Sequence, residues 1–167
     1  MDAFLAIVSR REVREYDGRA LPEESKRRIL EAGRLAGSSQ NRQSRRFVVL
    51  NDRAAVAETV FVPANILDAA FVVAIVTSGK GPLGLDAGRA AQNMMLAAHN
   101  EGIGSCPNGL ANGAEAARCA GAEEGEQVAT ILSFGYPAKP RDPERRSAEE
   151  WIARANRIPF DEIVSER

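Results

Sequence analysis

The chain has 167 residues, of which 44% are hydrophobic and 27% are charged, fractions that are typical of a globular protein and argue against wholesale disorder. This length favours one compact domain, spanning residues 1–167, over two. The 22 lysines and arginines nearly balance the 23 aspartates and glutamates, giving a net charge of −1. That balance excludes a basic field over the whole protein for binding nucleic acid.

The reactive side chains are few. Cys106 and Cys119 form neither a disulfide framework nor a Cys-x-x-Cys pair, and with His99 as the one histidine we expect no metal site. Asp2 stands where a signal peptide would carry basic residues, and no apolar run reaches the ~20 residues that span a bilayer. We therefore predict a cytoplasmic protein that does not act at a membrane.

The first elements are helical. Residues 2–9 predict a short helix that Asp2 caps, and Pro22 opens a second helix that ends near Gly37. A polar loop follows at 38–46, and then a short strand at 47–50.

The middle of the chain gives the clearest strand, the β-branched run 71–76. A loop at 77–84 leads to a helix over 87–101, for which we expect Asp86 to be the cap. Small and apolar residues form one wide face of this helix, at Ala87, Ala90, Ala91, Met94, Met95 and Ala98. Such a face is typical of a central core helix or of a subunit interface.

The last third predicts a strand after 102–105, a helix from Asn112 to Gly121 and a strand over 128–134. Ser147 and Glu150 form a capping box before a tail helix around Trp151, and an extended tail follows. Strands that alternate with helices in this way predict an α+β sandwich with one mixed sheet.

One motif is misleading. Residues 79–84 match the G-x-G-x-x-G fingerprint of dinucleotide-binding folds. That fingerprint requires an acidic residue about 20 positions further on, and residues 103–114 contain none. We therefore interpret 79–84 as a surface loop.

Arginines cluster near both ends of the chain, at Arg10, Arg11 and Arg14 and again at Arg154 and Arg157. Their guanidinium groups suit a phosphate dianion. Pairing with the acidic residues interspersed among them is the alternative, and the charge pattern alone favours it.

Four segments, taken in order, carry a resemblance. The run Ser9–Tyr16 is similar to an Arg-Arg-Ser-x-Arg-x-Phe opening, and Ala36–Phe47 to an Ala-Pro-Ser-x-x-Asn-x-Gln-Pro-Trp-x-Phe loop. Residues 86–106 are similar to a central helix and the strand that follows it in the same pattern. The last similar motifs are Gly135-Tyr136-Pro137 and Arg157-Ile158-Pro159. With these segments the chain resembles the nitroreductase family of FMN-dependent oxidoreductases over nearly its whole length.

This resemblance implies a three-layer α-β-α sandwich with a central mixed sheet, and a homodimer that holds FMN at its interface. Arg10, Arg11 and Arg157 would bind the FMN phosphate. Arg14 would reach the pyrimidine edge, with Asn65 as a fainter candidate beside it. Four residues would contact the flavin from the partner chain: Ser38, Ser39, Asn41 and Gln43. The backbone near Asn108 and Gly109 would face flavin N5.

The implied function is transfer of hydride from NADH or NADPH to nitro, quinone or related small-molecule acceptors by a ping-pong scheme. FMN performs this chemistry, so no catalytic side chain is required. The alternatives are a non-catalytic flavin-binding or sensor protein of the same fold, and a relative that binds another phosphate ligand or nucleic acid through residues 42–46.

Several positions depart from the family pattern. Glu12 replaces a phosphate-binding serine, and its carboxylate would repel a phosphate unless it turns away. Gly37, Ser44 and Arg45 replace Pro, Pro and Trp, which should loosen the loop. Segment 77–86 is short, so we expect no lid helices and an open site.

Overall fold

The structure is a computed structural model that describes residues 1–166. It divides into two compact units, one made of residues 11–141 and the other of both chain ends, Met1–Arg10 and the segment from Asp142 onward. This division was not predicted, because the smaller unit combines segments that lie more than 130 residues apart in the chain. Each unit is described by itself below.

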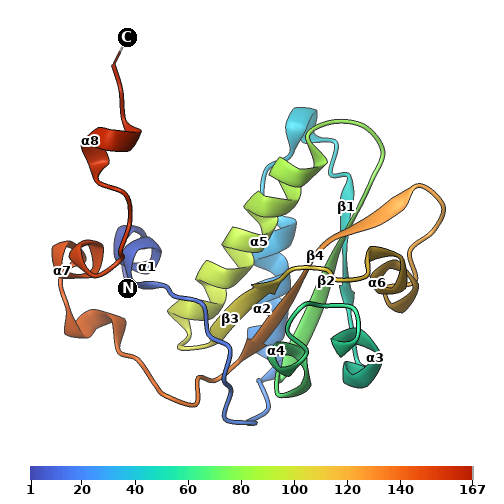
Figure 1. Ribbon diagram of the computed structural model, residues 1–167, viewed down its shortest axis with the longest axis horizontal. Helices are drawn as coiled ribbons and strands as arrows, with labels where there is room; N and C mark the ends of the chain where they lie inside the picture. The colour runs from blue at the N-terminus through green and yellow to red at the C-terminus, as the bar shows by residue number, and fades with distance from the viewer. Residues whose placement is uncertain (167) are drawn as a thin grey trace. The chain divides into compact units, whose positions relative to one another are not determined.

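The larger unit is built on a four-stranded sheet (Figure 1). Its strands are β1 (Arg45–Val49), β2 (Phe71–Ser78), β3 (Gly104–Asn108) and β4 (Glu126–Gly135), in the spatial order β1-β2-β4-β3. All three neighbouring pairs are antiparallel. The predicted mixed sheet is therefore wrong, because β3 pairs with β4 and not with β2, the strand that precedes it in the chain.

The same topology excludes a dinucleotide-binding fold. The glycine-rich segment 79–84 leads from β2 into helix α5 (Leu83–Asn100), but β3, the strand after α5, does not pair with β2, because the antiparallel strand β4 lies between them. A dinucleotide fingerprint needs a parallel βαβ unit. Residues 79–82 form the connection, as expected, but Leu83 and Gly84 already belong to α5.

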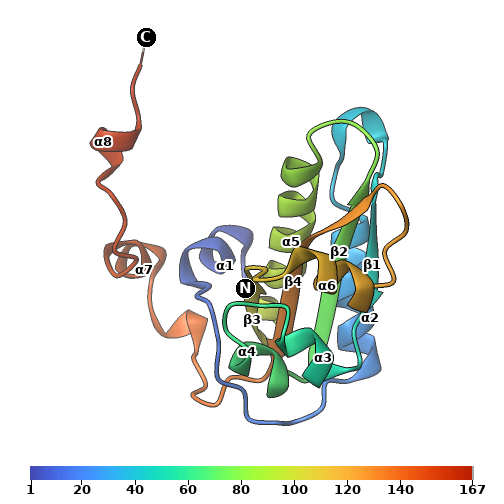
Figure 2. The same ribbon diagram turned by 45° about the vertical axis from the view of Figure 1, so that its right-hand side comes forward.

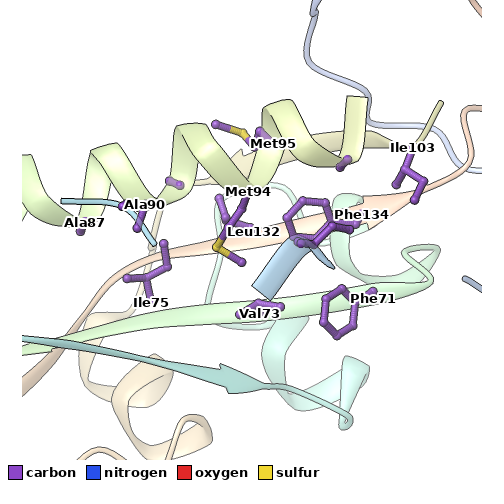
Figure 3. Packing of buried hydrophobic residues seen from close by; sticks show 14 of the residues in the cluster. Phe71, Val73, Ile75, Ala87, Ala90, Met94, Met95, Ile103, Leu132 and Phe134 are labelled. Carbon is purple, nitrogen blue, oxygen red and sulfur yellow. The ribbon is translucent and has the colours of Figure 1, made fainter. Parts of the chain in front are cut away.

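Helices α2 (Glu23–Arg34) and α5 pack against one face of the sheet. Alternate residues of a strand point to the same face, so β2 offers Phe71, Val73 and Ile75 to these helices. Figure 3 shows this side of the core, where Met94 of α5 lies against side chains of β2 and β4. The face of α5 that carries small and apolar residues is thus buried inside its own subunit. The sequence allowed a core helix or a subunit interface, and the structure shows a core helix.

Three short helices cover the opposite face of the sheet: α3 (Arg53–Ala57), α4 (Ala64–Leu67) and α6 (Gly113–Cys119). They pack on the remaining β2 residues, Val72, Ala74 and Val76. Figure 2 shows the three helices together on one side of the sheet. Helices α3 and α4 were not predicted, because at five and four residues they are too short to show a helical period.

Three predicted helix caps are confirmed, since the side chains of Asp2, Asn112 and Ser147 each accept a backbone N–H of the first turn. The predicted cap at Asp86 is wrong. Helix α5 begins at Leu83, and the Asp86 carboxylate instead accepts the backbone N–H of Ser39, at 3.1 and 3.2 Å.

In the smaller unit, helix α1 (Ala3–Ser9) packs against the 3-10 turn η2 (Pro143–Arg145) and helix α7 (Ala148–Ala153). Trp151 is buried in α7, and its Nε1 donates to the carbonyl of Pro143 over 2.8 Å. Trp151 therefore anchors the tail helix, as expected. The tail itself was predicted to be extended, but Phe160–Ile163 form one helical turn, α8.

No helix among residues 1–166 has both the length and the apolar character to cross a bilayer.

An ion pair between Arg46 of β1 and Glu126 of β4, at 2.5 Å, lowers the pKa of that carboxyl from 4.5 to about 2. A carboxyl whose pKa is lower in the folded state stabilises the fold above pH 4.5 and loses that contribution as the pH falls towards 2. We expect acid to lower the unfolding midpoint less steeply in Glu126→Gln than in the unmodified protein. Thermal unfolding followed by circular dichroism from pH 6 to pH 2 measures this, and identical slopes would contradict it.

Candidate functional site

Residues 13–17 lie along the ends of β3 and β4. The Val13 N–H donates to Ser105 of β3 over 3.0 Å, and the Asp17 N–H donates to Tyr136 just after β4, also over 3.0 Å. Two glycines permit this close approach. A Cβ on Gly104 would meet Val13 at 2.7 Å, and a Cβ on Gly135 would meet the Tyr16 ring at 2.7 Å. Any larger residue at either position would push the segment away.

Behind this segment lies a buried hydrogen-bond network. The phenol oxygen of Tyr16 lies 2.9 Å from the Val13 carbonyl oxygen and 3.0 Å from Oγ of Ser133. The Ser133 hydroxyl in turn accepts from the side-chain amide of Asn108, over 3.2 Å. Burial raises the pKa of Tyr16, so this phenol keeps its proton and remains a donor.

Asn65 and Asn108, two of the predicted site residues, contact one another. The side-chain N–H of Asn65 donates to Oδ1 of Asn108 over 3.0 Å, and the two residues are only 5% and 4% exposed. Asn65 was expected beside the flavin pyrimidine, but its amide is engaged inside the protein.

Gly109, by contrast, is exposed. Its carbonyl accepts the N–H of Phe61 over 3.1 Å, while its own N–H donates in none of the hydrogen bonds described for residues 1–166. A free backbone donor at the end of a well-held strand can bind an acceptor atom of a ligand.

An open cavity of about 350 Å³ lies beside the segment of residues 13–17. Three cations line it, Arg14, Lys139 and Arg141, together with the carboxylates of Glu12 and Glu15. The first three have no ionic partner in the part of the chain that the structure describes. Of these cations only Arg14 was predicted, because the positions of Lys139 and Arg141 depend on the long-range hydrogen bond from the Ala138 N–H to the Glu15 carbonyl.

The loop after α2 holds four predicted site residues: Ser38, Ser39, Asn41 and Gln43. Asp86 fixes the Ser39 backbone to α5, and the Ser38 hydroxyl accepts the Gln43 N–H over 2.9 Å. Asn41 and Gln43 both have positive φ, 54° and 55°, which tight loop geometry requires. The loop is therefore held by specific bonds, although it lacks the prolines of the family pattern.

Two departures in this loop have observable contacts. A Cβ at Gly37 would meet the guanidinium group of Arg89, so a larger residue requires that exposed side chain to move. Arg45 donates to the carbonyl of Ala36 and, over 3.4 Å, to that of Gly33, at the end of α2. An arginine at a helix C-terminus satisfies free carbonyls there.

The arginines expected to bind a phosphate lie as follows. Arg10 ends the first stretch of the smaller unit and Arg11 begins the larger one, both half-buried. Arg157 belongs to the smaller unit with Arg10, and its guanidinium donates to the carbonyls of Ala155 and Asn156, over 2.9 and 3.5 Å. Helix α1 packs on η2 and α7, the elements that precede Arg157. Both ends of the chain thus belong to one unit, while the approach of Arg157 to Arg10 remains a prediction.

The two cysteines are not among the residues of the groups described above. Cys106 is buried, and burial is the main cause that raises the pKa of the Cys119 thiol, away from the reactive thiolate. Among residues 1–166, no three His, Cys, Asp or Glu side chains come together as metal ligands.

The family described as "Putative TM nitroreductase" matches residues 2–166. The chain belongs to the nitroreductase family. It is 29% identical over 167 residues to a "Putative NADH dehydrogenase/NAD(P)H nitroreductase" of Archaeoglobus fulgidus, covering 87% of this chain and 96% of that protein. A protein of the same name from Methanothermobacter thermautotrophicus is 30% identical over 169 residues, covering 90% of this chain and 88% of the relative.

Solved structures of nitroreductases share the fold. A nitroreductase family protein from Clostridium difficile 630 superposes with a TM-score of 0.82 at 23% identity, over 99% of this chain and 98% of the other. A "putative nitroreductase in complex with FMN" from Desulfovibrio desulfuricans gives a TM-score of 0.79 at 25% identity, over 100% and 98%. The resemblance inferred from four sequence segments is thereby confirmed.

Proposed function

We propose that this nitroreductase family member is an FMN-dependent oxidoreductase that passes hydride from NADH or NADPH to nitro, quinone or related acceptors. The observation that carries the proposal is the free N–H of exposed Gly109 after the last residue of β3, the strand whose first residues bind the segment that bears the unpaired cation Arg14. The relatives named as NAD(P)H nitroreductases and the relative solved with FMN support it. When bound, FMN supplies the hydride transfer at N5.

The described residues fit this cofactor at both polar edges of its ring. The Gly109 N–H is a donor for N5, which is an acceptor in oxidised flavin. Arg14 supplies positive charge for the pyrimidine edge, where negative charge develops on reduction. Arg10, Arg11 and Arg157 are the proposed phosphate ligands, and arginine forks suit a phosphate dianion.

Homodimerisation is part of the proposal, since Ser38, Ser39, Asn41 and Gln43 would reach the flavin of the partner chain. The hydrogen bond that the Ser39 N–H donates to Asp86 supports homodimerisation, because this bond holds the loop on α5. Beside the loop is a groove of about 540 Å³ whose walls include Leu35 and Leu85, 65% and 63% exposed. Large apolar side chains left exposed in a groove suit a subunit contact.

Anaerobic stopped-flow mixing of the FMN-loaded protein with NADH or NADPH tests the activity. We expect either donor to bleach the flavin, and a nitro or quinone acceptor added afterwards to restore its colour. The donor and the acceptor would then use the flavin in two successive half-reactions. A flavin that neither donor bleaches would favour the alternative, a non-catalytic flavin-binding protein. The carboxylate of Glu12, which lines the same cavity as Arg14, is the observation that favours this alternative.

Arg157→Ala tests the phosphate assignment. Loss of a charge-assisted hydrogen bond should weaken FMN binding by about 1–3 kcal/mol. Fluorescence titration with FMN measures this effect. Arg34→Ala is the matched control, because Arg34 is an exposed arginine of α2 that pairs only with its helix neighbour Glu31 among the described residues. Equal affinities in the two variants would remove Arg157 from the site.

A further inference from the structure

Both ends of the Asn108 side-chain amide are engaged inside the protein. Its N–H groups lie 3.1 Å from the Cys106 carbonyl, 3.1 Å from the Ile131 carbonyl and 3.2 Å from Oγ of Ser133. Its oxygen accepts from Asn65. This residue ends β3, the strand at the edge of the sheet beside β4. Where the β3–β4 ladder stops, these side-chain bonds add to the backbone bond that the Phe61 N–H donates to the Gly109 carbonyl.

Asn65 provides such a bond from a separate element. It lies on the short helix α4 and approaches the face that Cys106 and Asn108 share as alternate residues of β3. Its side-chain nitrogen lies 3.0 Å from Oδ1 of Asn108 and 3.8 Å from Sγ of Cys106. A buried amide that loses such a partner carries the cost of an unsatisfied group, about 1–3 kcal/mol.

The segment that leads into α4 also holds the next residue of the chain. The Phe61 N–H donates to the Gly109 carbonyl over 3.1 Å, while Asn65 holds Asn108. The two bonds fix the residues on both sides of the Asn108–Gly109 peptide. The carbonyl of this peptide also accepts from Oγ1 of Thr130, over 3.4 Å. The direction of the Gly109 N–H is thereby set by residues 61–65 together with Thr130.

We propose that Asn65 is a positioning residue, which fixes the Asn108–Gly109 peptide so that the Gly109 N–H faces flavin N5. This inference rests on the proposed function and replaces a direct contact between Asn65 and the pyrimidine ring. Ser133 and Tyr16 extend the network to the segment that bears Arg14. One set of buried bonds thus orients the groups proposed for both polar edges of the ring.

The redox potential of bound FMN distinguishes this role from a merely structural one. Oxidised N5 accepts the Gly109 N–H, whereas reduced N5 carries its own hydrogen. Misplacing the N–H should therefore weaken binding of oxidised FMN about tenfold and that of reduced FMN little. For a two-electron couple, a tenfold difference raises the midpoint potential by about 30 mV. General loosening of the site would weaken both forms alike and leave the potential unchanged.

The experiment compares Asn65→Leu and Asn65→Asp with the unmodified protein, each loaded with FMN. We expect the leucine variant to show the raised potential at every pH. The aspartate variant can donate to Asn108 only when its carboxyl is protonated, and burial at this position raises the pKa of that carboxyl. Its difference from the unmodified protein should therefore be smallest near about pH 5 and largest near about pH 9. Ser25→Ala is the control, since it deletes a buried hydroxyl bonded to Glu101, on residues outside the network.

Unchanged potentials in both Asn65 variants would overturn the inference, as would an equal shift in Ser25→Ala. If Asn65→Leu does not fold, the pH dependence of Asn65→Asp decides alone, because it is measured within one folded protein. Failure of the unmodified protein to bind FMN would count against the proposed function itself, before any variant is compared.

Discussion

Replacing Gly135 with leucine is expected to expel Tyr16 from its site and to destabilise the fold by about 1–3 kcal/mol, the usual effect of overpacking. A Cβ at this position would lie 2.7 and 2.8 Å from Cδ1 and Cγ of the Tyr16 ring, which is itself buried. The phenol would then lose its bonds to Val13 and Ser133. Because the same segment carries Arg14, we also expect FMN affinity to fall at least about tenfold.

Chemical denaturation and FMN titration together measure these two effects. Gly113→Leu is the matched control, since a Cβ at Gly113 meets nothing within 4 Å and its φ is not positive. Gly135→Leu should unfold at lower denaturant concentration than the control. Equal midpoints would mean that Tyr16 is not held against Gly135 in solution.

The second large effect concerns charge. Arg14→Glu should weaken FMN binding by about 2–3 kcal/mol, because the change removes a charge-assisted bond and places a carboxylate at an edge that becomes negative on reduction. Arg14 is exposed and has no ionic partner in the described part of the chain, so stability should change by less than about 0.5 kcal/mol.

Isothermal titration with FMN measures the affinity, and thermal unfolding checks the fold. Arg118→Glu makes the same change of charge on α6, where Arg118 pairs with Glu115. If Arg14→Glu and Arg118→Glu bind FMN equally well, Arg14 does not contact the cofactor.

Local signals predicted the parts of the fold that depend on neighbouring residues. The caps at Asp2, Asn112 and Ser147 were found because a cap is bonded within three residues. Asp86 has the same chemistry, but its partner Ser39 lies 47 positions away. The antiparallel placement of β3 beside β4 likewise depends on long-range pairing, which no single segment encodes.

The site was predictable as a set of residues but not as an arrangement. Asn65 and Asn108 were chosen by resemblance for different roles, and their mutual bond joins positions 43 apart. Ser133 was missed, although the sequence carries a signal for it. It is a polar residue within the buried run Ile131–Phe134, and a polar group in such a run needs a buried partner.

The central claim, that this chain binds FMN through its own residues, is tested most directly by the visible absorption spectrum of the freshly purified protein. The ligand that it releases on denaturation is identified by mass spectrometry, and any empty sites are titrated with FMN. We predict a yellow protein, or one that turns yellow with added FMN, holding one FMN per chain. A colourless protein that also fails to bind added FMN would contradict the claim.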